Sequence, residues 1–183
     1  MERDEQKNSS SKLQELAGSG YEIQEGQPDI KGWDVQDATG RGFGEVIELL
    51  FHPPSQKVRY LVLDLAKNEF GLNPNKVIVP IGLANLKVNE NRVLLREVSA
   101  AQLERLPEYE RGQVNTSMET AVRNIFNEDV STDYVTEKDH HDPTFYEHRH
   151  YDEEEFYGKW KTNLDSGGIK HENSSDGTPN SPR

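Results

Sequence analysis

The sequence predicts a mainly β fold: a small antiparallel β-barrel with one or two short helices and an extended acidic tail. Residues 30–65 hold three candidate strands and two turns, and residues 76–98 add three short apolar runs. Turn residues, and not helical stretches, separate these runs. This spacing is typical of a barrel or sandwich and differs from alternating β and α units.

A predicted hairpin lies at the centre of this pattern. Strand side chains alternate between two faces, and residues 57–65 are apolar on both, with Val58, Tyr60 and Val62 opposite Leu61, Leu63 and Leu65. Both faces of this strand therefore need cover. The preceding run, residues 43–51, becomes apolar on both sides near its end. Pro53 and Pro54 cannot donate to a sheet ladder, so the chain must turn between the two runs.

The remaining strands are shorter. Residues 1–20 are polar, and we expect a flexible leader there. Tyr21 and Ile23 are candidates for the start of a first strand, and Trp33 and Val35 share a face of the next one.

After residue 65 the chain has turn residues and then three short apolar runs. These runs are residues 76–81, 84–88 and 92–98, and a tight polar connection joins the last two. Asp64 closes the long apolar strand, and we expect a backbone donor to satisfy its carboxylate.

Two helices are predicted after the strands. Ser99 with Gln102, and Thr116 with Glu119, each have the spacing of a capping box. The second helix carries an apolar stripe made of Met118, Val122, Ile125 and Phe126. We interpret this stripe as the cover for the second face of residues 57–65; the alternative is that it docks a partner subunit.

Residues 114–161 are predicted to hold this helix and then an acidic, aromatic extension. Residues 128–165 contain twelve acidic and four basic residues, yet seven aromatic ones. Disordered acidic tails contain few aromatic residues, so we expect this segment to dock and to contact a partner. The candidate contact residues are Phe145, Tyr146, Tyr151, Phe156, Tyr157 and Trp160. Asp152 is a candidate cap for a short helix that carries the last three, whereas residues 162–183 have the composition of a disordered tail.

Charge and composition exclude several classes of function. The formal net charge of −12 disfavours direct contact with nucleic acid. The chain has no cysteine, which excludes disulfides and thiolate chemistry. It has no signal peptide and no apolar run of about 18 residues, so we expect a cytoplasmic protein without a membrane span.

No motif predicts a cofactor, a metal or a catalytic residue. Gly40, Gly42 and Gly44 precede a strand, whereas a dinucleotide loop precedes a helix, so we read them as a turn and a close backbone approach. His148 and His150 would share a face in an extended segment, near His140 and His141, but that segment lacks the rigid support that a metal site needs. We therefore assign no metal site and expect no enzymatic activity.

Five short motifs together resemble the PRC-barrel family, and we place this domain at residues 21–113. The motifs are Asp-Ile-Lys-Gly-Trp-Asp-Val from residue 29, Gly40 with Gly-Glu-Val from residue 44, Val-Arg-Tyr-Leu-Val-Leu-Asp from residue 58, Val-Pro-Ile-Gly-Leu-Ala from residue 79 and Leu-Glu-Arg-Leu-Pro from residue 103. The family includes the cytoplasmic domain of the photosynthetic reaction centre H subunit and a ribosome maturation factor. The chain is more similar to the former, as a stand-alone member without its membrane helix.

The resemblance implies a non-catalytic barrel that binds other macromolecules. We expect an interaction or scaffold protein that binds a protein partner or associates with itself, as a homodimer or another homo-oligomer. The alternative is an accessory protein of ribosome maturation or RNA processing that binds a basic ribosomal protein, because acidic residues would steer such a partner.

Overall fold

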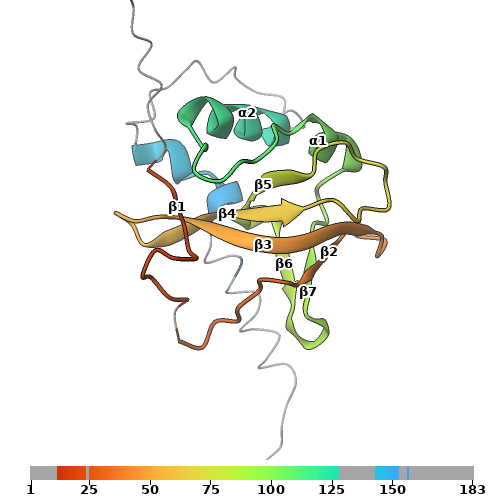
Figure 1. The fold of residues 1–183 in the computed structure, drawn as a ribbon, viewed down its shortest axis with the longest axis horizontal. Helices are drawn as coiled ribbons and strands as arrows, with labels where there is room; N and C mark the ends of the chain where they lie inside the picture. The colour runs from red at the N-terminus through yellow and green to blue at the C-terminus, as the bar shows by residue number, and fades with distance from the viewer. Residues whose placement is uncertain (1–11, 24, 128–142, 153–155, 157–183) are drawn as a thin grey trace, which may run out of the picture.

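The computed structural model describes residues 12–23, 25–127, 143–152 and 156, and they form one curved sheet with helices along one side (Figure 1). The mainly β fold class is confirmed. The seven strands are β1 (Gln14–Glu15), β2 (Asp34–Gln36), β3 (Gly42–His52), β4 (Lys57–Asp64), β5 (Lys76–Pro80), β6 (Asn85–Lys87) and β7 (Arg92–Leu94). The helices are α1 (Ala100–Arg105), α2 (Thr116–Asn127) and the short 3₁₀ turns η1 (Ile81–Leu83), η2 (Val88–Glu90), η3 (Pro143–Tyr146) and η4 (Arg149–Tyr151).

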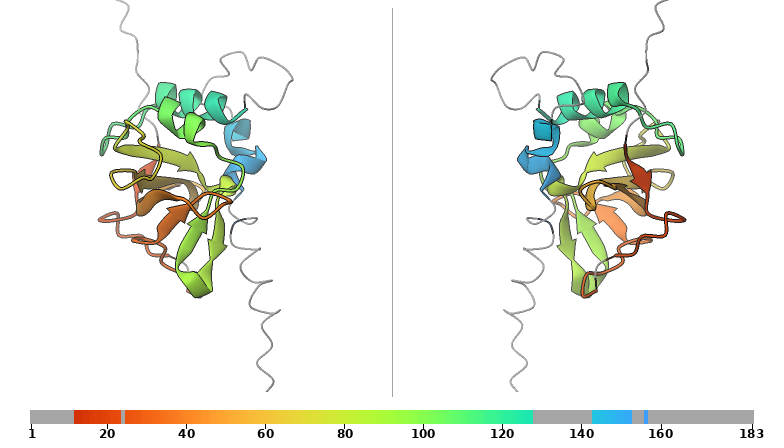
Figure 2. Two further views of the ribbon diagram at one scale, coloured as in Figure 1. Left: turned by 90° about the vertical axis from the view of Figure 1, so that its right-hand side faces the viewer. Right: turned by 90° about the vertical axis from the view of Figure 1, so that its left-hand side faces the viewer.

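The strand order is β5-β4-β3-β2-β7-β6, with β1 beside β3. Two details of the predicted antiparallel barrel need correction. The strands β2 and β7 pair in parallel, with Asp34 opposite Arg92. A long connection separates these two strands, so no tight hairpin forces them to run in opposite directions. In addition, no ladder joins β5 to β6 within the described residues, so the sheet curls without closing (Figure 2).

The β3–β4 hairpin is confirmed as the centre of the fold. Its register places His52 opposite Lys57 and Glu45 opposite Asp64, with two irregularities along the ladder. Bulges bend a strand and increase its twist, which lets the long β3 curve between its neighbours. Both faces of β4 are covered, because Tyr60, Leu61, Val62 and Leu63 are each 0% exposed.

The glycine-rich segment before β3 makes a turn and a close approach, as predicted. The Gly40 amide donates to the Asp37 carbonyl oxygen at 3.2 Å. Gly44 has a φ of +141°, and a Cβ atom there would lie 1.9 Å from the carbonyl oxygen of Asp64. Only glycine fits at this position. The Asp64 carboxylate accepts a hydrogen bond from the Ala66 amide at 2.9 Å, which confirms the predicted backbone donor.

The predicted leader is wrong for residues 14–19. Gln14 pairs with Phe51 in the β1–β3 ladder, and the Leu16 amide donates to the Leu49 carbonyl oxygen at 2.9 Å. The three-residue β2 leaves the second half of β3 with an unpaired edge, which this segment covers. No strand forms at residues 21–23; instead the ring of Tyr21 packs on that of Phe51, with 4.8 Å between centroids. Residues 1–11 lie outside the described part of the chain.

The cap of α1 is confirmed and the cap of α2 is not. The Ser99 side chain accepts from the Gln102 amide, and the Gln102 side chain accepts from the Ser99 amide. Before α2, Asn115 takes the capping position that we predicted for Thr116, because its Oδ1 accepts from the amide of Met118 at 2.9 Å.

The apolar stripe of α2 packs on the chain's own sheet, as predicted. Val122, Ile125 and Phe126 are buried in the main core, and Met118 packs against it. Glu119, which we predicted as the second half of a capping box, is also buried and is only 1% exposed. The reason is that Glu119 lies one turn before Val122 on the same face and therefore points toward the sheet.

Candidate interaction surfaces

The segment of residues 143–151, which we call the aromatic strap, packs against the barrel beside α2 (Figure 2). It consists of η3 and η4. Phe145 and Tyr151 are 6% and 1% exposed, and Phe156, just beyond the strap, is 1% exposed. All three belong to the same hydrophobic core as the sheet. The strap therefore covers one end of the barrel core.

Hydrogen bonds connect the strap to β4 and to α2. The Tyr60 hydroxyl donates to the Tyr151 hydroxyl at 3.2 Å, in a fully buried position. The Arg59 guanidinium donates to the Tyr151 carbonyl oxygen at 3.1 Å. From the strap, the Tyr146 hydroxyl donates to the buried Glu119 carboxylate at 2.6 Å. Both β4 and α2 thus hold the strap.

Two arginines add cation–π contacts to these hydrogen bonds. The Arg59 guanidinium carbon lies 4.6 Å from the ring centroid of Tyr146, and that of Arg123 lies 4.9 Å from the ring centroid of Phe145. Both distances are within the range in which a cation over an aromatic face is attractive. The arginines of β4 and α2 thus face aromatic rings of the strap.

A glycine permits the closest approach of the strap. A Cβ atom on Gly82 of η1 would lie 2.2 Å from the Arg149 carbonyl oxygen and 2.7 Å from the His150 carbonyl carbon. These distances are shorter than any contact that a real side chain makes, and the neighbouring atoms are backbone. The strap backbone therefore occupies the space that a side chain at residue 82 would need.

The buried phenols of this region stay protonated. Burial raises the pKa of Tyr60 well above its ordinary value, and it also raises the pKa of Tyr146 and of Tyr151. The charge of Glu119 adds to the shift for all three. The hydroxyl groups of Tyr60 and Tyr146 thus remain hydrogen-bond donors at any ordinary pH.

The strap carries two histidines with adjacent rings. The ring centroids of His148 and His150 lie 4.3 Å apart, and the amide of His150 donates to Nδ1 of His148 at 3.3 Å. Burial lowers the pKa of both groups, and that of His150 falls to about 4. In the described ranges no three His, Asp or Glu side chains converge as a metal site would require. His140 and His141 lie outside those ranges.

The structure describes four of the six predicted partner-contact residues. Phe145, Tyr151 and Phe156 are buried against the chain's own barrel, and Tyr146 is partly buried there. Tyr157 and Trp160 lie outside the described residues. In this conformation the four described side chains face the barrel, so a role in contacting a partner stays a prediction. Sequence analysis did not predict that Glu119, Arg123 and Gly82 contact the strap, because these residues lie far from it along the chain.

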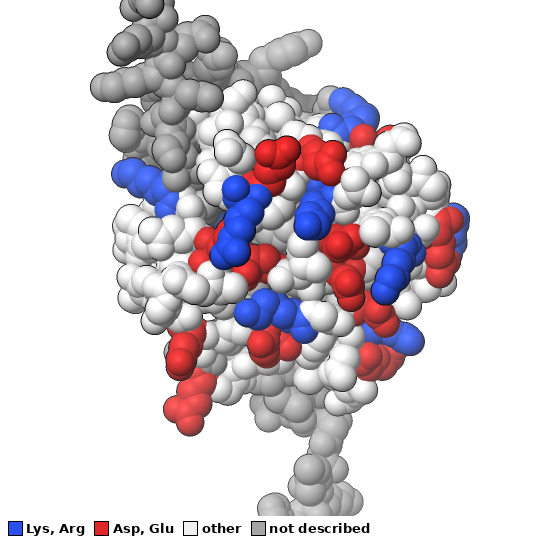
Figure 3. All heavy atoms as spheres, viewed as in Figure 1, with Lys and Arg blue, Asp and Glu red and all other residues white. Residues whose placement is uncertain are grey.

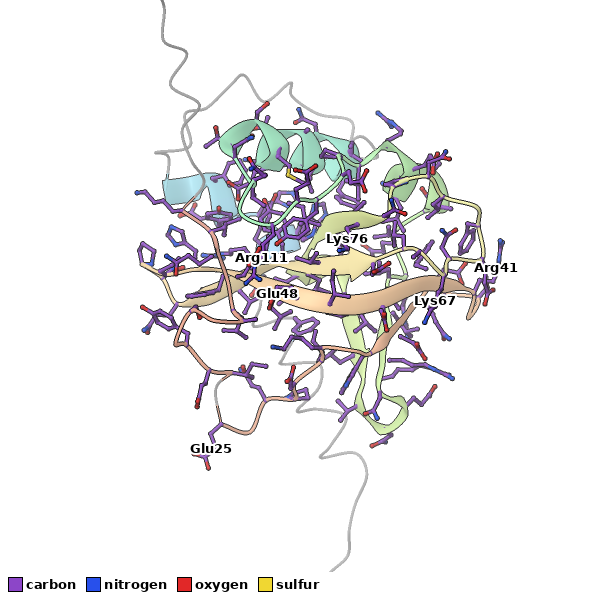
Figure 4. The ribbon with its side chains drawn as sticks, in the orientation of Figure 1. Glu25, Arg41, Glu48, Lys67, Lys76 and Arg111 are labelled. Carbon is purple, nitrogen blue, oxygen red and sulfur yellow. The ribbon has the colours of Figure 1, made fainter. Side chains whose placement is uncertain are left out.

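A second surface is a cleft of about 750 Å³ over β3 and β4, which we call the acidic cleft. Five carboxylates and two cations line it: Glu15, Glu48, Asp64, Glu108, Glu110, Lys76 and Arg111. Figure 4 shows Glu48, Lys76 and Arg111 gathered over the middle of the sheet, away from Arg41 and Lys67. Figure 3 shows acidic and basic side chains interspersed on this face.

The rim of the acidic cleft is tied to the N-terminal strand. The Tyr109 hydroxyl donates to the carboxylate of Glu15, and Arg111 forms an ion pair with the same carboxylate. The amide of Tyr109 donates to the Lys76 carbonyl oxygen of β5 at 2.7 Å. Burial, followed by the bond to Glu15, raises the pKa of Tyr109. Sequence analysis missed this cleft, because its residues come from five separate stretches of the chain.

A smaller hollow of about 290 Å³ adjoins the acidic cleft at Asp64. Its charged lining consists of Asp34, Glu45, Asp64, Glu69 and Lys67. Carboxylates therefore outnumber cations on both sides of Asp64. The combined surface suits a partner that presents basic side chains.

Residues 22–102 match the family model described as PRC-barrel domain. No curated protein matches the chain. In the part of the chain that the structure describes, no helix has the length and the apolar character needed to cross a membrane.

Proposed function

Because residues 22–102 form a PRC-barrel domain, we propose that the protein is a non-catalytic module that binds a protein partner through its acidic cleft. The observation that carries this proposal is the cleft itself. It is open to solvent, it extends over two strands of the barrel, and carboxylates outnumber cations in its lining by five to two. The partner is expected to present a basic segment.

Electrostatics support this role in two ways. The net charge of −12 attracts basic partners from a distance and raises their rate of association. At short range, Glu108 and Glu110 are exposed at the rim, within reach of lysine or arginine side chains of a partner. The Glu15 carboxylate instead holds Tyr109 and Arg111, so it keeps the rim in place.

The non-catalytic part of the proposal rests on the match to the PRC-barrel family model. In the cleft, Glu15, Tyr109 and Arg111 are engaged with one another. The rings of His148 and the buried His150, both in the strap, contact each other. The proposal includes a cytoplasmic location.

The experiment compares partners captured by the wild-type chain and by a charge-reversed chain. The variant Glu108→Lys/Glu110→Lys changes the rim, and Glu25→Lys, on a loop away from the cleft (Figure 4), is the matched control. We expect cross-linking in cells of the native organism to identify a partner that is basic. Its purified form should bind the rim variant at least tenfold more weakly than the control. Equal affinity for both variants contradicts a role of the cleft.

In more detail, we propose that the protein is a scaffold similar to the H subunit of the photosynthetic reaction centre. It would bind to a larger assembly or associate with itself. Light scattering at rising concentration tests self-association. A monomer at all concentrations removes the homo-oligomer from the proposal and leaves the heterologous partner.

The acidic cleft also fits a second candidate. Ribosomal proteins are basic, so the same surface suits an accessory protein of ribosome maturation. Co-sedimentation with ribosomal subunits that weakens as salt rises supports this candidate, because rim charges are screened by salt. Absence of co-sedimentation at low salt favours a partner outside the ribosome.

A further inference from the structure

One hydrogen bond within the strap needs a neutral histidine. Nδ1 of His148 accepts the hydrogen bond from the amide of His150, and a protonated Nδ1 has no lone pair for that bond. The two rings lie 4.3 Å apart, so two positive charges here would repel each other. His150 is only 4% exposed, which leaves its ring little water to solvate a charge.

The neighbourhood of the two rings is rich in cations. Arg149 lies between them in sequence, and Arg123 of α2 disfavours protonation of both. The other charged or titratable groups on packed elements are Arg59 and Tyr60 of β4, Glu119 of α2, Tyr146 of η3, His52 beside Tyr146, and Glu97, which pairs with Arg149 at 3.5 Å. The 3₁₀ turn η1 contributes no titratable side chain.

The acids in this set are already engaged. Glu119 accepts from Tyr146, and Glu97 pairs with Arg149. Neither carboxylate is among the groups that shift the pKa of His148 or His150. Protonation of the two rings therefore adds positive charge to a site already occupied by arginines.

We propose that the aromatic strap is a pH-operated latch, which stays closed over β4 and α2 while the rings of His148 and His150 are neutral and opens when they are protonated. The inference goes beyond the proposed function, because it concerns residues that do not line the acidic cleft. An open latch exposes Tyr60 and Gly82 together with Arg59 and Arg123. This uncovered groove is aromatic and contains the two arginines beside the Glu119 carboxylate, unlike the acidic cleft.

The direction of the pH effect follows from the lowered pKa values. A free histidine has a pKa of 6.5, whereas burial lowers the pKa of His150 in the closed latch to about 4. Between these values the open form binds more protons than the closed form, so closure weakens as the pH falls. From His150 alone, the closing equilibrium falls roughly 30-fold between pH 7.5 and pH 5. His148 adds to this loss with the same sign.

The test is a pH titration of the full ¹⁵N-labelled chain followed by NMR. The amide signals of Phe145 and Tyr151 report on the strap, and those of Leu61 and Val79 report on the barrel. We expect the strap signals to move to the positions of an unstructured chain with a midpoint between about pH 4 and 6.5, while the barrel signals keep their folded positions. The ring signals of His148 and His150 should titrate with the same midpoint.

Two variants separate the latch from general acid unfolding. His148→Asn/His150→Gln keeps an acceptor for the amide of residue 150 and removes both titrating rings, so its strap should stay closed at least one pH unit lower. His52→Asn, on the barrel side, should keep the wild-type midpoint, and His148→Asn alone provides an intermediate midpoint if the double variant is poorly folded. The proposal is overturned if the strap stays closed at pH 4, if strap and barrel unfold together, if the histidine variants keep the wild-type midpoint, or if His52→Asn abolishes the transition.

Discussion

The hydroxyl of Tyr60 on β4 donates a hydrogen bond of 3.2 Å to the hydroxyl of Tyr151 on η4, across 91 residues of sequence. Their rings meet edge to face, with centroids 5.4 Å apart, and both side chains are almost fully buried. This is a favoured geometry for aromatic pairs. The pair joins the centre of the sheet to the strap.

Removing either hydroxyl should weaken the fold. Tyr151→Phe leaves the buried Tyr60 donor without this acceptor, and we expect a loss of about 1–2 kcal/mol in the free energy of unfolding. The double variant Tyr60→Phe/Tyr151→Phe should lose less than the sum of the two single variants, because it leaves no orphaned group. Urea denaturation of the wild type, the two single variants and the double variant gives the coupling free energy between the two hydroxyl groups. Strict additivity would show that the two hydroxyl groups do not interact.

Gly82→Ala should detach the strap. The added Cβ would lie 2.2 Å from the Arg149 carbonyl oxygen, so the strap backbone must move away. We expect a cost of about 1–3 kcal/mol and faster cleavage of the strap by protease. Gly42→Ala is the matched control, because a Cβ there meets its nearest atom, the tip of the Glu69 side chain, at 3.4 Å. Equal protease resistance of both variants contradicts the close packing at η1.

Glu119 should be replaceable by an acceptor and not by an apolar residue. Glu119→Gln keeps an oxygen for the Tyr146 hydroxyl, so we expect a change below about 1 kcal/mol. Glu119→Leu leaves this hydroxyl without its acceptor in a largely buried site, and the expected cost is about 1–3 kcal/mol. Thermal unfolding of both variants, with and without Tyr146→Phe, checks that Glu119 and Tyr146 are coupled. If Glu119→Leu costs as much in the Tyr146→Phe background as in the wild type, the two residues are not coupled.

Substitutions of the adjacent residues Asn115 and Thr116 test which of them caps α2. Asn115→Ala removes the side-chain oxygen that accepts from the Met118 amide, and such caps contribute about 1 kcal/mol. Thr116→Ala should change the free energy of unfolding by less than about 0.5 kcal/mol, since Thr116 is already inside the helix. Denaturant titrations of the two variants measure both values. A larger loss of stability for Thr116→Ala than for Asn115→Ala would identify Thr116 as the cap.

Local sequence patterns were sufficient for the elements that depend on neighbouring residues. The hairpin follows from Pro53 and Pro54 between two apolar runs, and the cap of α1 follows from Ser99 and Gln102. The packing of α2 on the sheet follows from an apolar stripe at helical spacing. In each case the residues that decide the structure lie within a few positions of one another.

The features that sequence analysis missed depend on distant contacts. β1 is only two residues long, which is too short to show alternation, and it forms because β3 offers an open edge. Asn115 and Thr116 are adjacent and both are good capping residues, so the sequence spacing does not decide which of them caps α2. The aromatic residues of the strap were identified as docking residues, but their sites at Glu119 and Gly82 appear only in the folded chain.

The long separation of Tyr60 from Tyr151 also sets an order of events during synthesis. A ribosome adds about 5–20 residues per second, so Tyr60 is made roughly 5–20 seconds before its partner. The strands and α2 precede the strap in the chain and are available to fold first. Each newly made molecule therefore passes through an interval in which the groove beside α2 is still bare and accessible to chaperones.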